Sequence, residues 1–242
     1  MPPTISVSVI VMAYNEVESV VAVTRDLHAV LSALPASFEL LLVDDGSSDG
    51  TSQAVDSLAA ELPAVRAIHH PENRGLGGVY RTGFSEARGD FLTFFPADGQ
   101  FEAALVSEFF SLITSHDLVL GMLPKREGSL GKVLSFTERR LYRRLIGPMP
   151  EFQGIFMIRK AVLDAVPLLS TGRGWGIVME LILRVFRANR YRIVNHSTRL
   201  LPRRFGHSKA NTWRNIVANM RQLLALRRLL STPVNQAQGS GK

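Results

Sequence analysis

Short apolar runs alternate with helical segments along the first half of the chain. None of the runs has a helical period, which is typical of buried strands. They are Ile5–Met12, Phe38–Val43, Val65–His69, Phe91–Phe95 and Leu118–Leu120. The segments between them predict helices, near residues 17–34, 51–62, 76–88 and 102–114. Alternating strands and helices predict an α/β fold, with a mostly parallel central sheet covered by helices.

The alternation ends after Gly121. The second half predicts a basic helix, a strand, two helices and a short strand, over Ser129–Ile146, Phe152–Ile158, Lys160–Leu168, Ile177–Ala188 and Tyr191–Asn195. No internal repeat or low-complexity linker is visible. At 242 residues, the chain can bury a full core as one domain, or as one domain with an appended region.

The most informative loop follows the second predicted strand. It has the sequence DDGSSDGT, from Asp44 to Thr51, and a Ser or Asp in it can cap the following helix. Open α/β sheets bind ligands at the carboxyl ends of their strands, so these carboxylates and the nearby backbone N–H groups outline a nucleotide pocket. Asp-Gly-Ser clusters are also common in ordinary turns. The nucleotide interpretation is favoured because the first strand also ends in polar residues, at Tyr14 and Glu16.

The fourth predicted strand delivers Asp98 and Gln100, two residues apart. In an extended loop they point to the same side and offer two hard oxygen ligands. Such ligands suit Mg²⁺ or Mn²⁺ that is already held by a substrate diphosphate. The pair alone is a weak signal, and its expected place on the same sheet edge as Asp44 strengthens it.

The positive charge is concentrated near the C-terminus. The net charge is +7, and thirteen Lys and Arg but no Asp or Glu follow Glu180. This distribution suggests a polyanionic partner, which could be substrate phosphates, anionic lipid or nucleic acid, although a solvated basic face is the simpler alternative. Within this region, Arg203, Ser208 and Lys209 surround Gly206 in a loop whose cations match phosphate oxygens. Single-strand binders interleave aromatic and basic residues, and the few aromatic residues here argue against nucleic acid.

The next segment predicts an amphipathic helix, with apolar residues at helical spacing: Trp213, Ile216, Val217, Met220, Leu223 and Leu224. Its apolar face either packs on the core or lies at a membrane interface. The chain has no Cys and no visible signal peptide, and no apolar run approaches the roughly 18–20 residues that cross a bilayer. We therefore expect a cytoplasmic protein, with peripheral membrane contact as an option.

A glycine-rich segment, Asn73 to Gly78, is similar to a phosphate-binding loop. A Rossmann dinucleotide site is disfavoured because these glycines do not follow the first strand. The segment is either a flexible helix entry near the ligand or a structural turn.

Taken together, these motifs resemble an inverting family 2 glycosyltransferase of the GT-A (Rossmann-like) fold, most similar to the polyprenyl-phosphate, dolichyl-phosphate mannose synthase-like branch. The matching segments are Val11–Glu16, Val43–Thr51, Ala97–Gln100 and Arg203–Lys209, in the family's order over about residues 5–210.

The resemblance implies roles for particular residues. Ala13, Tyr14, Glu16 and Asp44 or Asp45 would hold the nucleoside, and Asp98 and Gln100 would ligate Mg²⁺ or Mn²⁺ on the diphosphate. Arg203, Ser208 and Lys209 would hold donor and acceptor phosphates. Arg126 and Arg140 lie roughly where the family has further phosphate-binding arginines. We expect a glycosyltransferase catalytic domain over 1–210, followed by the amphipathic helix over 211–231 and, from its composition, a disordered tail over 232–242.

The membrane helices that many members of the family carry after the catalytic domain are absent, and the chain departs from the family pattern at two further places. Pro96 replaces the Asp that usually opens the metal motif, and Pro150–Ile155 lacks the usual acid or has it displaced to Glu151. These departures leave open a degenerate homologue that binds nucleotide sugar without turnover.

The reaction that we expect is a metal-assisted inverting transfer from a GDP- or UDP-sugar. A polyprenyl phosphate is the favoured acceptor because it is already anionic at neutral pH and requires no strong base. A hydroxyl acceptor is the alternative and needs a general base. Glu180, at a predicted helix start, and Glu151 are the candidates for that base.

Overall fold

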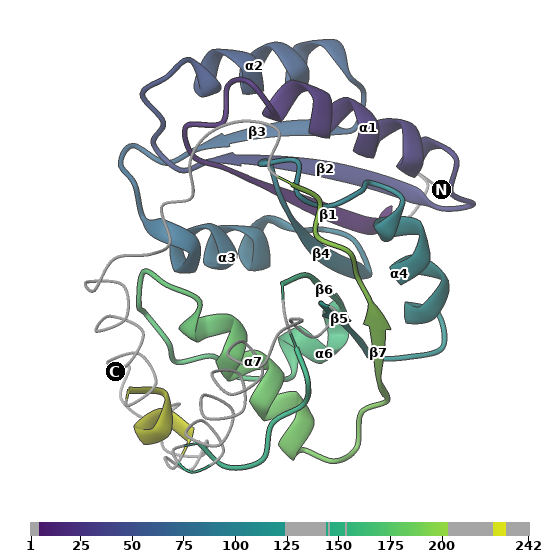
Figure 1. Ribbon diagram of the computed structural model, residues 1–242, viewed down its shortest axis with the longest axis vertical. Coiled ribbons are helices and arrows are strands. Elements are labelled where there is room, and N and C mark those ends of the chain that lie inside the picture. Colours follow the sequence, from purple (N-terminus) through teal and green to yellow (C-terminus); the bar gives the residue numbers. More distant parts are fainter. Residues whose placement is uncertain (1–4, 124–143, 145, 153, 203–224, 231–242) are drawn as a thin grey trace.

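The computed structural model describes residues 5–123, 144, 146–152, 154–202 and 225–230. One seven-stranded sheet organises them (Figure 1). The strands are β1 (Ile5–Ala13), β2 (Ser37–Asp44), β3 (Val65–His69), β4 (Phe91–Pro96), β5 (Leu118–Met122), β6 (Phe156–Arg159) and β7 (Ile193–Ser197). The helices are α1 (Val20–Ser32), α2 (Thr51–Glu61), α3 (Gly75–Glu86), α4 (Leu105–Ile113), α6 (Lys160–Asp164) and α7 (Gly176–Arg187).

The strand order is β3-β2-β1-β4-β6-β5-β7. β6 runs antiparallel to its neighbours β4 and β5, and the other neighbouring strands run parallel to each other. The predicted mostly parallel α/β sheet is therefore confirmed. The chain winds outward from β1 to β3 and then returns to place β4 on the other side of β1. This reversal creates a switch point between β1 and β4, the place where open α/β sheets bind ligands.

Helices cover both faces of the sheet because successive strand residues alternate between the faces. Val9 and Val11 pack with α1, α2 and α4 in one core cluster. Ile10 packs with α3, α6 and α7 in the other. Figure 1 shows these two helix layers above and below the sheet.

Most predicted element bounds agree with the structure to within a few residues, and two differ more. The strand predicted from Phe152 begins at Phe156, after Gly154 turns the chain with φ +95°. The helix predicted to Leu168 ends at Asp164, because Pro167 disfavours helical backbone in the residue before it.

The predicted C-terminal helix is described only over residues 225–230, which are helical. Leu226, 2% exposed, packs there with Ile146 and with Met179 and Leu183 of α7. The remaining apolar positions of that helix, and most of the predicted helix Ser129–Ile146, lie outside the described residues. Within the described ranges, no helix has the length and apolar character that a bilayer crossing requires.

Candidate active site

The carboxyl ends of β1, β2, β3 and β4 lie side by side. In register, Ala13 is opposite Asp44, Asp44 is opposite His69, and Met12 is opposite Pro96. Backbone hydrogen bonds extend this alignment beyond the strands, because the Asp45 N–H donates to Ala13 O and the Ala97 N–H donates to Met12 O. The prediction that these loops share one sheet edge is confirmed. We call this edge, formed by residues 13–17, 44–51, 69–75 and 96–100, the rim.

The loops that follow β1 and β2 are bound to each other. The Asn15 N–H donates to Ser47 Oγ, and the Ser48 N–H donates back to Asn15 Oδ1, each over 2.9 Å. The Glu16 N–H donates to Thr51 Oγ1 over 2.9 Å. Asn15 adopts a left-handed conformation, with φ 53°. This conformation is several-fold enriched in Asn among non-Gly residues, and the local polar contacts hold it here. The two loops therefore form one rigid unit.

The start of α2 differs from the prediction of a Ser or Asp cap. Gly50 occupies the cap position, in a left-handed conformation with φ 97°. Asp49, one residue before the cap position, binds the first residue of the helix. Its Oδ1 accepts the Thr51 N–H over 3.0 Å and the Thr51 hydroxyl over 2.6 Å. Burial raises the pKa of Asp49, but these hydrogen bonds outweigh it and hold the pKa below its ordinary value.

Asp44 is 1% exposed and is surrounded by donors. Its Oδ1 accepts the Ser47 N–H over 3.1 Å, and its Oδ2 lies 2.5 Å from Ser52 Oγ and 3.1 Å from His69 Nδ1. Burial raises the pKa of Asp44, but hydrogen bonds from Ser47, Ser52 and His69 outweigh it and lower the pKa. Asp44 is therefore an anion near neutral pH.

Asp45 is 3% exposed and joins the rim to α3. Its Oδ1 and Oδ2 accept the N–H groups of Arg74 and Gly75, each over 2.8 Å, and its Oδ1 also lies 2.6 Å from His70 Nδ1. His70 Nε2 in turn lies 2.8 Å from Thr82 Oγ1 of α3. Asp45 thus supports the start of α3 from a neighbouring strand, as an acidic group near a helix N-terminus does.

The sequence analysis did not select the two histidines. His69 and His70 follow each other at the end of β3. His69 contacts Asp44 and His70 contacts Asp45 at the end of β2. His69 also reaches α2, with Nε2 2.9 Å from Asp56 Oδ1. Burial lowers the pKa of His69, but its hydrogen bonds to Asp44 and Asp56 and their charges raise it above the ordinary value. In the sequence, two consecutive Asp residues end one predicted strand and two consecutive His residues end the next, and this pattern could have indicated their contact.

The residues expected at the end of β1 reach the rim with different exposures. The Ala13 side chain is 2% exposed, whereas Tyr14 is 38% exposed. Glu16 Oε2 accepts the Ser19 hydroxyl over 3.0 Å, and the Glu16 carbonyl accepts the Val20 N–H at the start of α1. Tyr14 thus presents its ring at the surface of the rim, while Glu16 helps to begin α1.

Asp98 and Gln100 lie in a turn rather than in the expected extended loop. The Gln100 N–H donates to Asp98 Oδ1 over 3.1 Å, and Gly99 has φ +69°. Asp98 is 9% exposed. Two hard oxygen donors at the switch point fit a divalent ion that substrate phosphates also ligate. In the described part of the chain, no group of three or more His, Asp or Glu side chains could hold a metal by itself.

The glycine-rich segment at the start of α3 serves a packing role. A Cβ on Gly77 would lie 2.0 Å from Gly172 O, and the Gly77 N–H donates to Arg173 O over 2.8 Å. Arg173 returns a contact, with Nη2 2.8 Å from Asn73 Oδ1. Glycine is required here because the loop before α7 contacts the α3 backbone directly. The contact also brings Arg173 next to the rim, to which Arg74 belongs; neither arginine was among the predicted site residues.

The expected role of Glu180 as a general base does not fit its surroundings. Glu180 lies inside α7, not at its start, and is fully buried. Its carboxylate accepts the N–H groups of Leu169 and Ser170, and Oε1 lies 2.7 Å from Arg184 Nη2. Glu180 therefore fixes the chain before α7.

The remaining site predictions cannot be placed on the rim. Arg126, Arg140, Arg203, Ser208 and Lys209 lie outside the described residues. The other candidate base, Glu151, is described and exposed, and its carbonyl accepts the Asn195 side chain over 2.6 Å.

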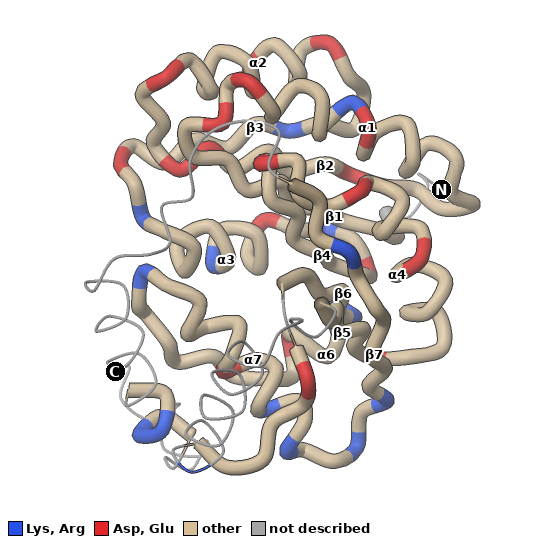
Figure 2. Tube along the Cα trace, viewed as in Figure 1, with Lys and Arg blue, Asp and Glu red and all other residues tan. Residues whose placement is uncertain are grey.

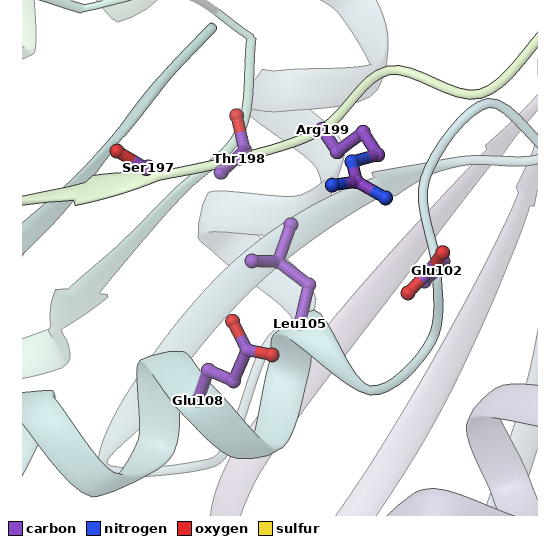
Figure 3. Close-up of a pocket in the computed structure, with 6 residues that line it drawn as sticks. All are labelled: Glu102, Leu105, Glu108, Ser197, Thr198 and Arg199. Carbon is purple, nitrogen blue, oxygen red and sulfur yellow. The ribbon is translucent and has the colours of Figure 1, made fainter. Parts of the chain in front are cut away.

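A hollow of about 370 Å³ lies beside α4. Figure 3 shows Ser197 at the end of β7, with Thr198 and Arg199 after it, along one side of the hollow, and Leu105 and Glu108 of α4 on the other. Its lining includes none of the residues that the sequence analysis selected. It flanks the rim on the α4 side.

Comparison with known proteins identifies relatives. The sequence profile described as glycosyl transferase family 2 matches residues 8–167. Dolichol-phosphate mannosyltransferase of Saccharomyces cerevisiae is 31% identical over 191 residues, which cover 75% of this chain and 72% of that protein. Undecaprenyl-phosphate mannosyltransferase of Micrococcus luteus is 30% identical over 215 residues, covering 83% of this chain and 85% of that protein.

Solved structures share the fold. Glucosyl-3-phosphoglycerate synthase of Mycobacterium tuberculosis, in complex with UDP, superposes with a TM-score of 0.66 at 17% identity, over 92% of this chain and 80% of that one. The same enzyme with Mn²⁺, UDP and phosphoglyceric acid gives 0.67 at 21% identity, over 93% and 78%. The GT-A-like fold expected from the sequence is thereby confirmed.

Proposed function

The chain belongs to glycosyl transferase family 2, and on this premise we propose that it transfers a sugar from a nucleoside diphosphate sugar to a polyprenyl phosphate. The observation that carries the proposal is the alignment of β1, β2 and β4, which brings the Tyr14, Asp44–Asp45 and Asp98 loops to one rim. The relatives from yeast and Micrococcus, whose names specify dolichol phosphate and undecaprenyl phosphate, support this choice of acceptor.

In this proposal the nucleoside lies over the ends of β1 and β2. Tyr14 offers an exposed ring face to the base, and Ala13 and Glu16 line the same loop. His69 and His70 fix the carboxylates of Asp44 and Asp45. Both carboxylates are almost fully buried, so in this proposal they fix the loops on which the base and ribose would lie.

The diphosphate would lie at the switch point, near Asp98 and Gln100. These two residues would hold Mg²⁺ or Mn²⁺, which would neutralise negative charge on the phosphate oxygens. The structures of the mycobacterial synthase contain Mn²⁺ together with UDP, which supports this cofactor class. Arg203, Ser208, Lys209, Arg126 and Arg140 would supply the cations and the hydroxyl that bind donor and acceptor phosphates.

The reaction is a single displacement. An anionic oxygen of the acceptor phosphate attacks the anomeric carbon of the sugar, and the bond from that carbon to the diphosphate oxygen breaks. The sugar leaves with inverted configuration as the lipid phosphosugar, and the electron pair remains on the nucleoside diphosphate. Cations around the diphosphate stabilise the charge that develops in the transition state, commonly the largest contribution in such sites.

The surroundings of Glu180 favour a phosphate over a hydroxyl acceptor. A hydroxyl needs a base within hydrogen-bond reach of its proton, and Glu180 is fully buried with its carboxylate oxygens bonded to Leu169, Ser170 and Arg184. An acceptor phosphate is already anionic near neutral pH.

Two measurements test the proposal. Thermal-shift screening with GDP, UDP and their sugars, with and without Mg²⁺ or Mn²⁺, should find a donor that raises the melting temperature. That donor should then give lipid phosphosugar when mixed with a polyprenyl phosphate, as detected by mass spectrometry. A donor that is consumed only with hydroxyl acceptors would refute the choice of acceptor, and a chain that binds donors without turnover would be a degenerate homologue.

A further inference from the structure

Exposed arginines gather around the C-terminal end of α7. We call the set of Arg144, Arg187, Arg190, Arg227 and Arg228 the arginine face; all five are exposed. Figure 2 shows Lys and Arg along the lower edge of the molecule, near the end of α7 and residues 225–230, and acidic residues around α1 and α2.

Packing brings the arginine face together from three segments of the chain. Leu226 is buried against Ile146 and Leu183 in one apolar cluster, so Ile146 and the helical residues 225–230 are held on α7. Arg187 donates from Nη2 to Ile146 O, and Arg184 donates from Nη2 to Leu229 O over 3.3 Å. The positions of these cations therefore follow from the core of the protein.

Acidic residues are scarce in the segments that supply four of these five arginines. No Asp or Glu follows Glu180 in the sequence, and Glu180 itself is buried against Arg184. Among the described residues, no carboxylate forms an ion pair with Arg144, Arg187 or Arg190. By contrast, Arg25 in α1 is bridged to Glu61 at 2.9 Å, and Arg66 lies 3.3 Å from Glu39. The asymmetry gives the molecule a positive end and an acidic end, which would orient it at a charged surface.

Aromatic and apolar groups accompany the arginines. Phe186 is 37% exposed and precedes Arg187, and Arg190 lies over the Tyr191 ring at 4.9 Å from its centroid. Leu229 and Leu230 are partly exposed. Basic residues interleaved with aromatic and aliphatic side chains are typical of proteins that lie at the headgroup level of a membrane.

We propose that the arginine face docks on the anionic lipid headgroups of a membrane. The cations come from three segments, a spread that fits several headgroups better than one substrate phosphate. α7 connects this face to the rim, since Arg173, just before the helix, contacts Gly77 at the start of α3. The twelve residues of α7 place the arginine face about 18 Å from the loop that contacts α3. The inference rests on the proposed function in one respect only, that docking would bring the rim to a lipid-borne acceptor.

The test uses the full chain and vesicles that contain no polyprenyl phosphate. Co-sedimentation should be strong with vesicles that include phosphatidylglycerol, weak with phosphatidylcholine alone, and reduced by added salt. The double variant Arg190→Glu/Arg228→Glu should bind the anionic vesicles at least about tenfold more weakly. The matched control, Arg25→Glu/Arg88→Glu, makes the same change of net charge on other surfaces and should bind as the unmodified chain does. Thermal melting establishes that both variants are folded.

Equal binding by the two double variants would overturn the proposal, as would equal binding to neutral and anionic vesicles. Displacement of the chain from anionic vesicles by a stoichiometric oligonucleotide would assign the face to nucleic acid instead. Transfer to a short-chain prenyl phosphate in solution, without vesicles, is measured in parallel and should be equal in both variants. A chain that binds vesicles but transfers no sugar would contradict the proposed function and leave the docking surface standing.

Discussion

Nδ1 of His70 lies 2.6 Å from Oδ1 of Asp45, and both side chains are at least 95% buried. The contact joins β3 to the loop after β2. Asp45 also accepts the N–H groups of Arg74 and Gly75 at the N-terminus of α3. The start of α3 in turn contacts the loop before α7. One buried carboxylate thus connects the proposed nucleoside site to the second half of the molecule.

Replacing His70 tests this connection. His70→Ala should lower the free energy of unfolding by about 1–3 kcal/mol, because the buried oxygen of Asp45 loses a partner. It should also weaken donor binding, since Asp45 is then less fixed. Denaturant unfolding and donor titration measure the two effects. His116→Ala is the control, because that ring lies near the end of α4 and contacts Leu112 O and Ser115. A fully stable His70→Ala variant would contradict the proposed role.

His69 makes part of the stability depend on pH. Its pKa in the folded protein is raised above the ordinary 6.5 by Asp44 and Asp56. The stabilisation from protonated His69 is therefore fully present below about pH 6.5 and is lost as the pH rises through the folded pKa. The difference in melting temperature between the unmodified chain and His69→Gln should be largest near pH 5–6 and should shrink above pH 7. A difference in melting temperature that stays constant from pH 5 to above pH 7 would exclude stabilisation by protonated His69.

Gly77 and Gly172 form a matched pair on opposite sides of one contact. A Cβ on Gly77 would lie 2.0 Å from Gly172 O, whereas a Cβ on Gly172 would meet nothing within 4 Å. Gly77→Ala should therefore cost about 1–3 kcal/mol or more of stability through overpacking, and Gly172→Ala should be nearly neutral. Urea unfolding of both variants measures this. Equal costs would show that the loop before α7 adjusts freely.

Asp98→Asn tests the metal role with little change of shape. Asn has the same shape as Asp but carries no charge. Turnover should fall at least about 100-fold, as expected for loss of a charge-stabilising group at a reacting phosphate. The melting temperature should stay close to that of the unmodified chain. Asp164→Asn, at an exposed position at the end of α6, is the control. Unchanged turnover and metal dependence in Asp98→Asn would remove Asp98 from the site.

Glu180→Gln separates a structural from a catalytic role. Loss of the buried pair with Arg184 should lower stability by about 3–5 kcal/mol, because a mostly buried cation loses its partner. At temperatures where the variant is folded, kcat should match that of the unmodified chain. A variant that is stable but inactive would restore Glu180 as the general base.

The sequence predicted those features that depend on local pattern. The alternation of apolar runs and amphipathic segments predicted the α/β sheet, and the polar residues after each run predicted the rim. Strand register supports this inference, because Ala13, Asp44 and His69 lie opposite one another at the carboxyl ends of parallel strands. The motifs also indicated the family, which the profile match established.

Contacts between residues far apart in the chain decided the rest. Asp45 and Gly75 are 30 positions apart, and Arg173 and Asn73 are 100 apart. Neither pair has a periodicity or a motif that predicts its contact. The sequence therefore determined the fold class and the edge where chemistry can occur, because periodicity and turn chemistry are local properties. Only the tertiary structure decided that His69 and His70 hold the aspartates, that the glycines pack against the loop before α7 and that Glu180 is buried. Each of these depends on which strand and helix ends become neighbours when the chain folds.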